Sequence, residues 1–209
     1  MRTEKLNNLI KLKKGLKGNS LIIPEFKGIR VIDYKKNNKI ISEKFLNKFN
    51  KFNKLIIRSS AKDEDTDNYS NAGKYLSKVV INEVKSIHIG IKFIIDKLRD
   101  EDEIIIQSFI ENPDYSGVLF TRDLNDNSPY YTINIDKSKK TNVITSGSHS
   151  KTMETYVIHR SLKYIDRKFF KLIAYIKKIE SIFKSERLDI EFAYKNKIYY
   201  IFQTRKLFK

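Results

Sequence analysis

The stretch of sequence that decides the fold is LDIEFAYKNKIYYIFQTR, residues 188–205. Two strand-like runs flank a short polar turn, which is the pattern of a β-hairpin. Because successive side chains of a strand point to opposite faces, Asp189 and Glu191 share one face. Gln203 and Arg205 share one face of the returning strand for the same reason. The hairpin therefore offers two carboxylates, an amide and a guanidinium.

The register of this hairpin depends on the length of its turn. With a three-residue turn at residues 195–197, Tyr194 pairs with Ile198 and Asp189 faces Gln203. A two-residue turn shifts the register by one position and moves Gln203 to the opposite face. We therefore expect the three-residue turn if these polar side chains form one site.

The four polar side chains suit magnesium and phosphate. Mg²⁺ prefers hard oxygen ligands, takes few of them from the protein and completes its octahedron with phosphate oxygens and water. An arginine adds a permanent charge and a forked donor for phosphate oxygens. The exposed face of an ordinary amphipathic hairpin carries the same residue types, so the spacing alone leaves both interpretations open.

Hydrophobic periodicity outlines the rest of the chain. It predicts helices over residues 4–14, 43–53, 83–99 and 161–184, and strands over residues 20–23, 55–57, 104–110, 117–121 and 130–135. Residues 61–73 are polar and rich in turn formers, and we expect a mobile loop there. Residues 141–159 are typical of a hairpin or a loop. Because neighbouring strands have the pattern of hairpins, we expect an α+β (mixed α/β) fold rather than a doubly wound parallel sheet.

Composition limits the class of protein. A chain of 209 residues that is 40% hydrophobic can form one domain or two small lobes. No run approaches the roughly 18 apolar residues that cross a bilayer, and the basic N-terminus has no apolar segment of a secretory signal. We therefore expect a cytoplasmic protein with no membrane partner. The absence of cysteine excludes disulfides, thiolate nucleophiles and cysteine–zinc sites.

The net charge of +17 raises the question of a nucleic-acid partner. More than half of the excess lies in residues 1–54, where lysine alternates with asparagine, isoleucine and phenylalanine. No known nucleic-acid-reading motif accompanies the charge. We expect no dedicated nucleic-acid binding, and a solvated basic face that attracts polyphosphate.

Six short motifs follow one another along the chain in the order of a known family. They are LIIRSSAKDED (55–65), YSNAGKY (69–75), IQSFI (106–110), SGVLFT (116–121), DIEF (189–192) and QTR (203–205). Together they resemble the ATP-grasp nucleotide-binding domain of the pyruvate phosphate dikinase and phosphoenolpyruvate synthase family. Each motif is short, and their common order carries the resemblance.

The resemblance implies a fold and an activity. The fold would be ATP-grasp, with two lobes of mainly antiparallel sheet, residues 1–105 and 106–209, that enclose a nucleotide cleft. The chain would bind ATP with Mg²⁺ and supply the phosphoryl-donor half-reaction of a dikinase-like phosphotransferase. Residues 130–136 and 141–148 are similar to relatives from polysaccharide gene clusters, including the glutamine-kinase type.

The resemblance also implies the roles of the polar residues. Arg58 would contact the ATP phosphates and Arg205 would brace the transferring phosphates, which makes these two arginines the candidate catalytic residues. Glu191 and Gln203 would bind the magnesium ion, and Asp189 would lie in the nucleotide pocket.

Further residues are implied around the nucleotide. Gln107, Phe109 and Ile110 would belong to the segment that meets the adenine, and the loop at residues 61–73 would close over the nucleotide. The family has an early Gly-Gly-Lys motif that is absent here. Counting back four residues from Leu6 places Arg2 at the position of its phosphate-binding lysine.

The chain departs from the family in its phosphate carrier. Family members pass phosphate to a histidine on a separate swivelling domain, and then to a small acceptor. His88, His149 and His159 lie in no such motif, so we expect a phosphohistidine-domain partner protein or downstream domains beyond Lys209. Two alternatives stay open: a non-catalytic nucleotide-binding remnant with a regulatory role, and a basic nucleic-acid-binding protein.

Overall fold

The computed structural model describes residues 2–16, 18, 20–62, 76–139, 152–162 and 167–207. The chain divides into two compact units, unit 1 (Met1–Asn7 and Pro24–Phe109) and unit 2 (Asn8–Ile23 and Ile110–Lys209). These ranges differ from 1–105 and 106–209 at two places. Residues 8–23 belong to unit 2 because β1 (Leu21–Ile22) pairs with β10 (Ile198–Lys206). Residues 106–109 belong to unit 1 because β5 (Glu103–Ser108) continues to Ser108 and the Phe109 N–H donates to the Lys54 carbonyl.

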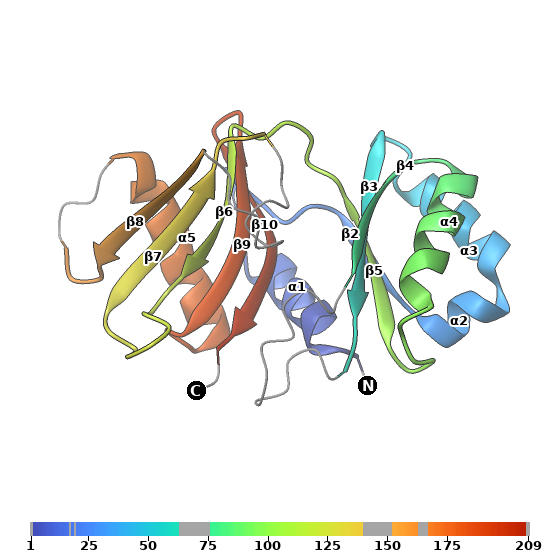
Figure 1. Ribbon diagram of the computed structural model, residues 1–209, viewed down its shortest axis with the longest axis horizontal. Helices are drawn as coiled ribbons and strands as arrows, with labels where there is room; N and C mark the ends of the chain where they lie inside the picture. The colour runs from blue at the N-terminus through green and yellow to red at the C-terminus, as the bar shows by residue number, and fades with distance from the viewer. Residues whose placement is uncertain are drawn as a thin grey trace. The chain divides into compact units, whose positions relative to one another are not determined.

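Unit 1 is an antiparallel four-stranded sheet with helices packed on one face (Figure 1). The strand order is β2-β5-β3-β4. Isoleucines of the sheet and of α4 form the core of this unit and are shielded from solvent. The remaining elements of unit 1 are β2 (Phe26–Arg30), α2 (Val31–Lys36), α3 (Asn38–Lys48), β3 (Lys54–Ser60), β4 (Ser77–Ile81) and α4 (Val84–Ile95).

The first turn of α1 (Glu4–Gly15) belongs to unit 1 and packs against β2. The side chain of Leu6 lies directly over Gly28, so that a Cβ atom at Gly28 would come within 2.3 Å of a Leu6 methyl carbon. Gly28 therefore provides the close approach that brings the helix onto the strand.

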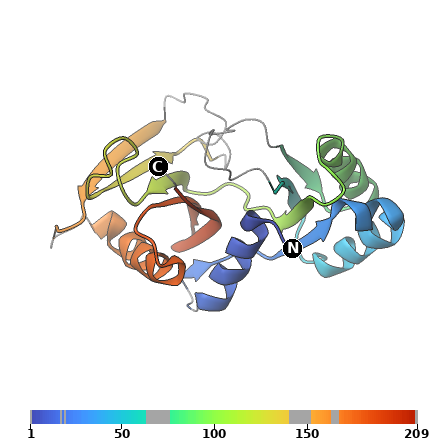
Figure 2. The same ribbon diagram turned by 90° about the horizontal axis from the view of Figure 1, so that it is seen from below.

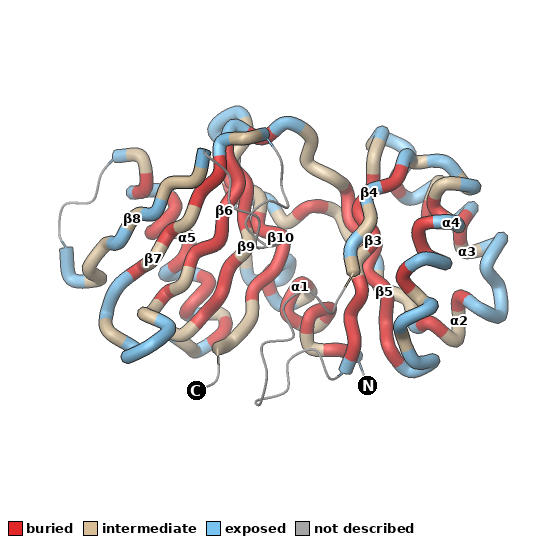
Figure 3. Tube along the Cα trace, in the orientation of Figure 1, coloured by how far each residue is buried: buried red, intermediate tan, exposed pale blue. Residues whose placement is uncertain are grey.

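Unit 2 is a six-stranded sheet with α5 (Arg167–Phe183) packed on one face (Figure 1 and Figure 2). The strand order is β1-β10-β9-β6-β7-β8, antiparallel except for the β1–β10 pair. Figure 3 shows that the central strands are buried along most of their length. The remaining strands of unit 2 are β6 (Tyr115–Phe120), β7 (Tyr130–Asp136), β8 (Met153–His159) and β9 (Leu188–Lys195).

The expected fold class, α+β with mainly antiparallel sheets, is confirmed. The helix expected over residues 43–53 is wrong in its position, since α3 covers Asn38–Lys48. The sequence patterns missed β2, β4 and α2, and β8 forms where a hairpin or a loop was expected. Among the residues described, no helix has both the length and the apolar character needed to cross a bilayer.

The three-residue turn expected in the terminal hairpin is wrong. Ile198 pairs with Lys195, so the turn has two residues, Asn196 and Lys197. Both have positive φ angles, 51° and 63°, which is the conformation of a type I′ hairpin turn. This turn matches the right-handed twist of the two strands, which favours it over a longer connection.

A β-bulge in β10 places Gln203 on the same sheet face as Glu191, which the two-residue turn alone would not do. Ile201 pairs with Phe192, whereas Gln203 pairs with Glu191, so Phe202 is an extra residue in the strand. The bulge shifts the register by one and returns Gln203 to the face of Glu191. Asp189 therefore faces Arg205 and not Gln203.

Replacing Gly117 with alanine should destabilise unit 2. An added Cβ atom would lie 2.4 Å from the backbone oxygen of Asn134 and 2.9 Å from the ring of Phe192. We expect Gly117→Ala to lower the free energy of unfolding by about 1–3 kcal/mol, because both neighbours are tightly packed. Gly18→Ala is the control, since no atom lies within 4 Å of its added Cβ. Equal urea midpoints for the two variants would contradict this packing.

Replacing Lys197 with glycine should stabilise the terminal hairpin. A non-glycine residue at a φ of 63° is strained, and Asn-Gly is the preferred pair for this turn. We expect Lys197→Gly to raise the free energy of unfolding by about 0.5–1 kcal/mol. Lys206→Gly, in the extended part of the same hairpin, should lower it. A loss of stability in Lys197→Gly, measured by thermal unfolding, would indicate a different turn.

Candidate functional site

The open face of unit 2, defined as the sheet face opposite α5, carries the polar residues of the terminal hairpin. The register aligns Gln203 with Glu191 and, on β6, Val118. The adjacent row aligns Arg205 with Asp189 and Phe120. The opposite side chains of β9, Leu188, Ile190 and Phe192, are buried in the core with α5.

Asp189 and Arg205 form an ion pair on the open face. Arg205 Nη2 donates a hydrogen bond to Asp189 Oδ2 at 2.7 Å. Asp189 is only 6% exposed, so its carboxylate needs a cationic partner to be stable there. Arg205 is more exposed than its partner. The pair therefore holds a guanidinium in a fixed position at the surface of the sheet.

Glu191 and Gln203 are directly opposed on neighbouring strands. Directly paired residues of an antiparallel sheet have Cβ atoms about 5 Å apart. Their carboxylate and amide oxygens are the hard donors that Mg²⁺ takes from proteins. Across the described residues, no group of three or more Asp, Glu or His side chains gathers. The pair fits a magnesium ion that draws its other ligands from phosphate and water.

Arg58 and Gln107 lie on adjacent strands of unit 1 and on the same sheet face. Arg58 pairs with Ile105 and Gln107 pairs with Ile56, and the alternating residues of both strands point into the core with α4. The Gln107 side chain is fully buried. Neither its oxygen nor its nitrogen has a hydrogen-bond partner within the part of the chain that the structure describes.

An unpartnered buried amide costs free energy unless a ligand completes it. Gln107 is therefore suited to a ligand that offers both a donor and an acceptor. Phe109 follows directly after β5, and its N–H donates to the Lys54 carbonyl at 3.1 Å. The chain passes from unit 1 to unit 2 between Phe109 and Ile110.

Lys5 is a candidate site residue that the sequence interpretation missed. Its side chain is 7% exposed, and its Nζ donates to the Ser59 carbonyl at 3.0 Å, next to Arg58. The available signal was helical spacing, since Lys5 lies on the same face of α1 as the buried Leu9 and Leu12. A lysine on the apolar face of a helix is unusual and suggests a buried role for its charge.

The start of α1 is held by buried polar contacts. Thr3 donates to Glu103 Oε2 through its backbone N–H, at 2.8 Å, and through its hydroxyl, at 2.6 Å. The Thr3 and Ser60 hydroxyls lie 2.6 Å apart. These contacts tie the residues before Lys5 to β3 and β5, so the ammonium group of Lys5 has a defined position beside Ser59.

Arg2, the remaining expected site residue, and the three histidines have ordinary surroundings or lie outside the described residues. Arg2 is exposed, and its carbonyl accepts a hydrogen bond from Asn7 Nδ2 at 3.3 Å. His88 Nδ1 is 2.8 Å from the Tyr34 hydroxyl and His159 Nδ1 is 2.7 Å from the Ser161 hydroxyl. Most of the expected mobile loop lies in residues 63–75, and His149 and the 141–148 motif lie in residues 140–151; both segments are outside the described residues.

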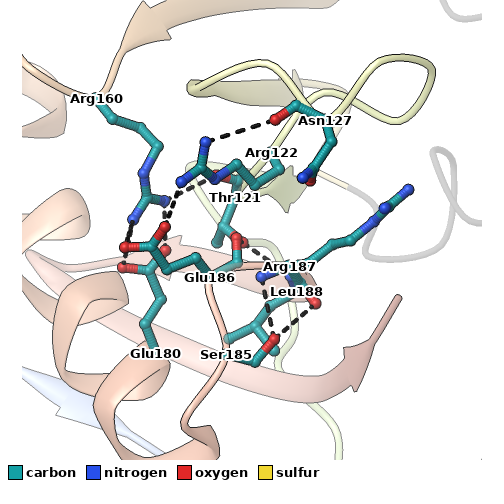
Figure 4. Close-up of polar contacts among 9 residues, drawn as sticks. All are labelled: Thr121, Arg122, Asn127, Arg160, Glu180, Ser185, Glu186, Arg187 and Leu188. Carbon is teal, nitrogen blue, oxygen red and sulfur yellow. Dashed lines mark hydrogen bonds and ion pairs between the residues drawn. The ribbon is translucent and has the colours of Figure 1, made fainter. Parts of the chain in front are cut away.

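A network of charged residues anchors the start of β9 (Figure 4). Arg160 donates to Glu180 of α5 at 2.5 Å and to the Thr121 carbonyl at 2.8 Å, and it also lies 3.2 Å from Glu186. A hydrogen bond from Arg122, together with the charge of Arg160, lowers the pKa of Glu186. The network therefore joins the end of α5 to the end of β6.

Tyr131 lies beneath this network. The Arg160 guanidinium carbon is 4.6 Å from the centre of its ring, which is a cation–π distance. Burial, followed by the charge of Glu180, raises the pKa of Tyr131 to about 12. The ring is therefore a neutral platform for Arg160 at physiological pH.

The chain matches no known family model and no curated protein sequence. It is similar to solved structures of ligases. D-alanyl-alanine synthetase A from Vibrio cholerae has a TM-score of 0.58 at 10% identity, over 98% of this chain and 55% of that one. D-alanine–D-alanine ligase from Helicobacter pylori has a TM-score of 0.52 at 13% identity, over 96% and 50%. L-amino acid ligase from Bacillus licheniformis has a TM-score of 0.51 at 12% identity, over 99% and 43%.

The present chain spans about half the length of these ligases. At such low identity the likeness concerns the fold alone, and it does not single out the dikinase and synthase family. The ligases are ATP-grasp enzymes. The fold of this chain is therefore the ATP-grasp fold.

Proposed function

We propose that this chain is an Mg–ATP-binding domain that supplies the phosphoryl-donor half-reaction of a dikinase-like phosphotransferase. The observation that carries the proposal is the open face of unit 2, where the Glu191–Gln203 pair lies beside the Asp189–Arg205 ion pair. The ATP-grasp fold supports ATP as the ligand. A structure similar to this chain, D-alanine–D-alanine ligase from Bacillus anthracis, is complexed with ATP (TM-score 0.53, 11% identity).

In this proposal the residues of unit 2 act on the phosphates. Glu191 and Gln203 would hold the magnesium ion, which would supply positive charge to the phosphates. Arg205 directs its fork at the transferring phosphoryl group, and Asp189 keeps that guanidinium in place. Catalysis of phosphoryl transfer depends mainly on such positioning and charge stabilisation.

Unit 1 contributes the other nucleotide contacts in this proposal. Arg58 and Lys5 supply positive charge to the phosphates, since the Lys5 ammonium group lies beside the residue that follows Arg58. Gln107 and the backbone of Phe109 and Ile110 contact the adenine. The support for Gln107 is its buried amide, which has unused hydrogen-bonding groups for the donor and acceptor edge of a base.

The phosphoryl acceptor distinguishes two candidate functions. The sequence motifs favour a histidine on a separate phosphohistidine domain or partner protein, followed by a small acceptor of the glutamine-kinase type. The ligase structures favour a second candidate, ATP-dependent ligation at the same Mg–ATP site. Incubation with labelled ATP and candidate partner proteins separates them, because a phosphohistidine leaves an acid-labile label on a protein and ligation leaves none.

Removing the carboxylate of Glu191 should weaken magnesium-dependent ATP binding. We expect calorimetry to show Mg²⁺-dependent ATP binding by the wild type, and at least about a tenfold loss in Glu191→Gln because a metal ligand is lost. Glu154→Gln, on β8 of the same sheet, should bind like the wild type. No ATP binding by the wild type would reject the proposed function. Unchanged Mg²⁺-dependent binding in Glu191→Gln would reject only the ligand assignment.

Lys5 and Arg2 are alternative phosphate contacts near the N-terminus. Lys5 is buried beside Ser59, whereas Arg2 is exposed. We expect Lys5→Met to lower the ATP affinity about tenfold, the range of one charge-assisted hydrogen bond, and Arg2→Met to lower it by less than about twofold. The two variants remove one positive charge each, so each controls for the other. A larger effect of Arg2→Met would assign the phosphate contact to Arg2.

A further inference from the structure

Arg187 extends the open face of unit 2 beyond the metal-binding pair. It directly precedes β9, and its carbonyl accepts a hydrogen bond from the Leu207 N–H at 3.0 Å, so the ladder continues past Leu188. Leu188 is fully buried in the core beneath α5. The alternation of side chains therefore places Arg187 on the same face as Asp189 and Glu191.

The backbone on both sides of Arg187 is pinned. The Arg187 N–H donates to the Ser185 hydroxyl at 3.1 Å, and the Leu188 N–H donates to the Thr121 hydroxyl at 2.8 Å. The Thr121 hydroxyl in turn donates to the Glu186 carbonyl at 2.5 Å. The side chain of Arg187 thus starts from a fixed point, which reduces the entropy lost when it binds a ligand.

The neighbouring arginines are occupied by carboxylates. Arg160 is bound to Glu180 and Glu186, Arg122 to Glu186, and Arg205 to Asp189. Arg187 differs from them. Figure 4 shows its side chain running away from the Arg160–Glu180 pair.

The side chain of Arg187 makes no hydrogen bond or ion pair with any residue in the described ranges, and its Nε is shielded from water. A desolvated guanidinium donor without a partner is unfavourable in the free protein. Its natural partner is an anion that brings two oxygens to the fork of the guanidinium. Phosphate and carboxylate groups have this geometry.

The position of Arg187 relates this anion to the phosphate site. At about 3.3 Å per residue, Arg187 lies about 7 Å along the strand from Asp189 and about 13 Å from Glu191. An oxyanion held by its side chain therefore lies beside the Asp189–Arg205 pair, on the side away from Glu191 and Gln203.

We propose that Arg187 binds an oxyanion, either phosphate or carboxylate, at the end of the Mg–phosphate site on unit 2. The location rests on the proposed function. The oxyanion belongs either to the terminal phosphate of ATP or to the phosphoryl acceptor, and these sources share one recognition chemistry. Arg187 thereby positions the group that donates or receives the phosphoryl.

The test compares Arg187→Gln and Arg187→Lys with the wild type. Lys177→Gln is the matched control, because it removes one charge from the exposed side of α5. One arm measures the affinities for Mg–ADP and for the non-hydrolysable Mg–AMP-PNP by calorimetry. The other arm titrates inorganic phosphate into protein saturated with Mg–AMP-PNP, so that the terminal phosphate position is already filled.

Either of two results supports the proposal and identifies the source of the oxyanion. If Arg187→Gln loses about tenfold or more in AMP-PNP affinity with unchanged ADP affinity, Arg187 binds the terminal phosphate. If both nucleotide affinities are unchanged and phosphate binding to the loaded protein falls about tenfold or more, Arg187 binds the acceptor. Arg187→Lys should retain part of the affinity, and Lys177→Gln all of it.

The proposal is overturned if Arg187→Gln matches the wild type in every titration. Thermal unfolding tests for a purely structural role, because the loss of an unpartnered arginine should leave the melting temperature unchanged or raise it. A lower melting temperature of Arg187→Gln with unchanged affinities would also overturn the proposal. If the wild type binds no nucleotide, the proposed function fails, and phosphate titration of the free proteins still decides whether Arg187 binds an oxyanion.

Discussion

The β-bulge at Phe202 is the constraint on which the candidate site depends. The two-residue turn sets a register that, continued without interruption, would point Gln203 and Arg205 into the core beneath α5. A buried guanidinium there would have no carboxylate, since Asp189 points the other way. One extra residue in β10 removes this conflict. Because of the bulge, the hairpin can keep its favourable two-residue turn while Gln203 and Arg205 still lie on the face of Glu191 and Asp189.

Local alternation was sufficient to predict the strands of the hairpin and the common face of Asp189 and Glu191. It was not sufficient to predict the register, because a longer turn and a bulge both bring Gln203 to the same face. Residues 198–202 are all hydrophobic, so the sequence of this strand carries no local sign that locates the bulge. The choice between the two solutions depends on cross-strand pairing, which short-range pattern does not contain.

In unit 1 the sequence interpretation failed where long-range packing decides the structure. β2 contains Gly28 and two basic residues and has weak strand propensity, yet the strand forms because Leu6 packs on Gly28 and β5 pairs with it. Lys5 was missed because the position of the family's phosphate-binding lysine was counted back four residues from Leu6, which gives Arg2. Leu9 is also on the buried face of α1, and the same count from Leu9 gives Lys5. Arg58 and Gln107 could be proposed from motifs, but the unpaired amide of Gln107 is visible only in the fold.

That amide has a consequence for the choice of base. An amide group presents an oxygen and a nitrogen in nearly equivalent positions, and neither atom of Gln107 is held by another residue in the described part of the chain. Rotation by half a turn exchanges donor and acceptor without changing the shape of the side chain. If Gln107 contacts the base as proposed, it alone would not discriminate adenine from guanine. Selectivity between the two purines would then fall to the backbone of Phe109 and Ile110, whose donors and acceptors cannot be exchanged.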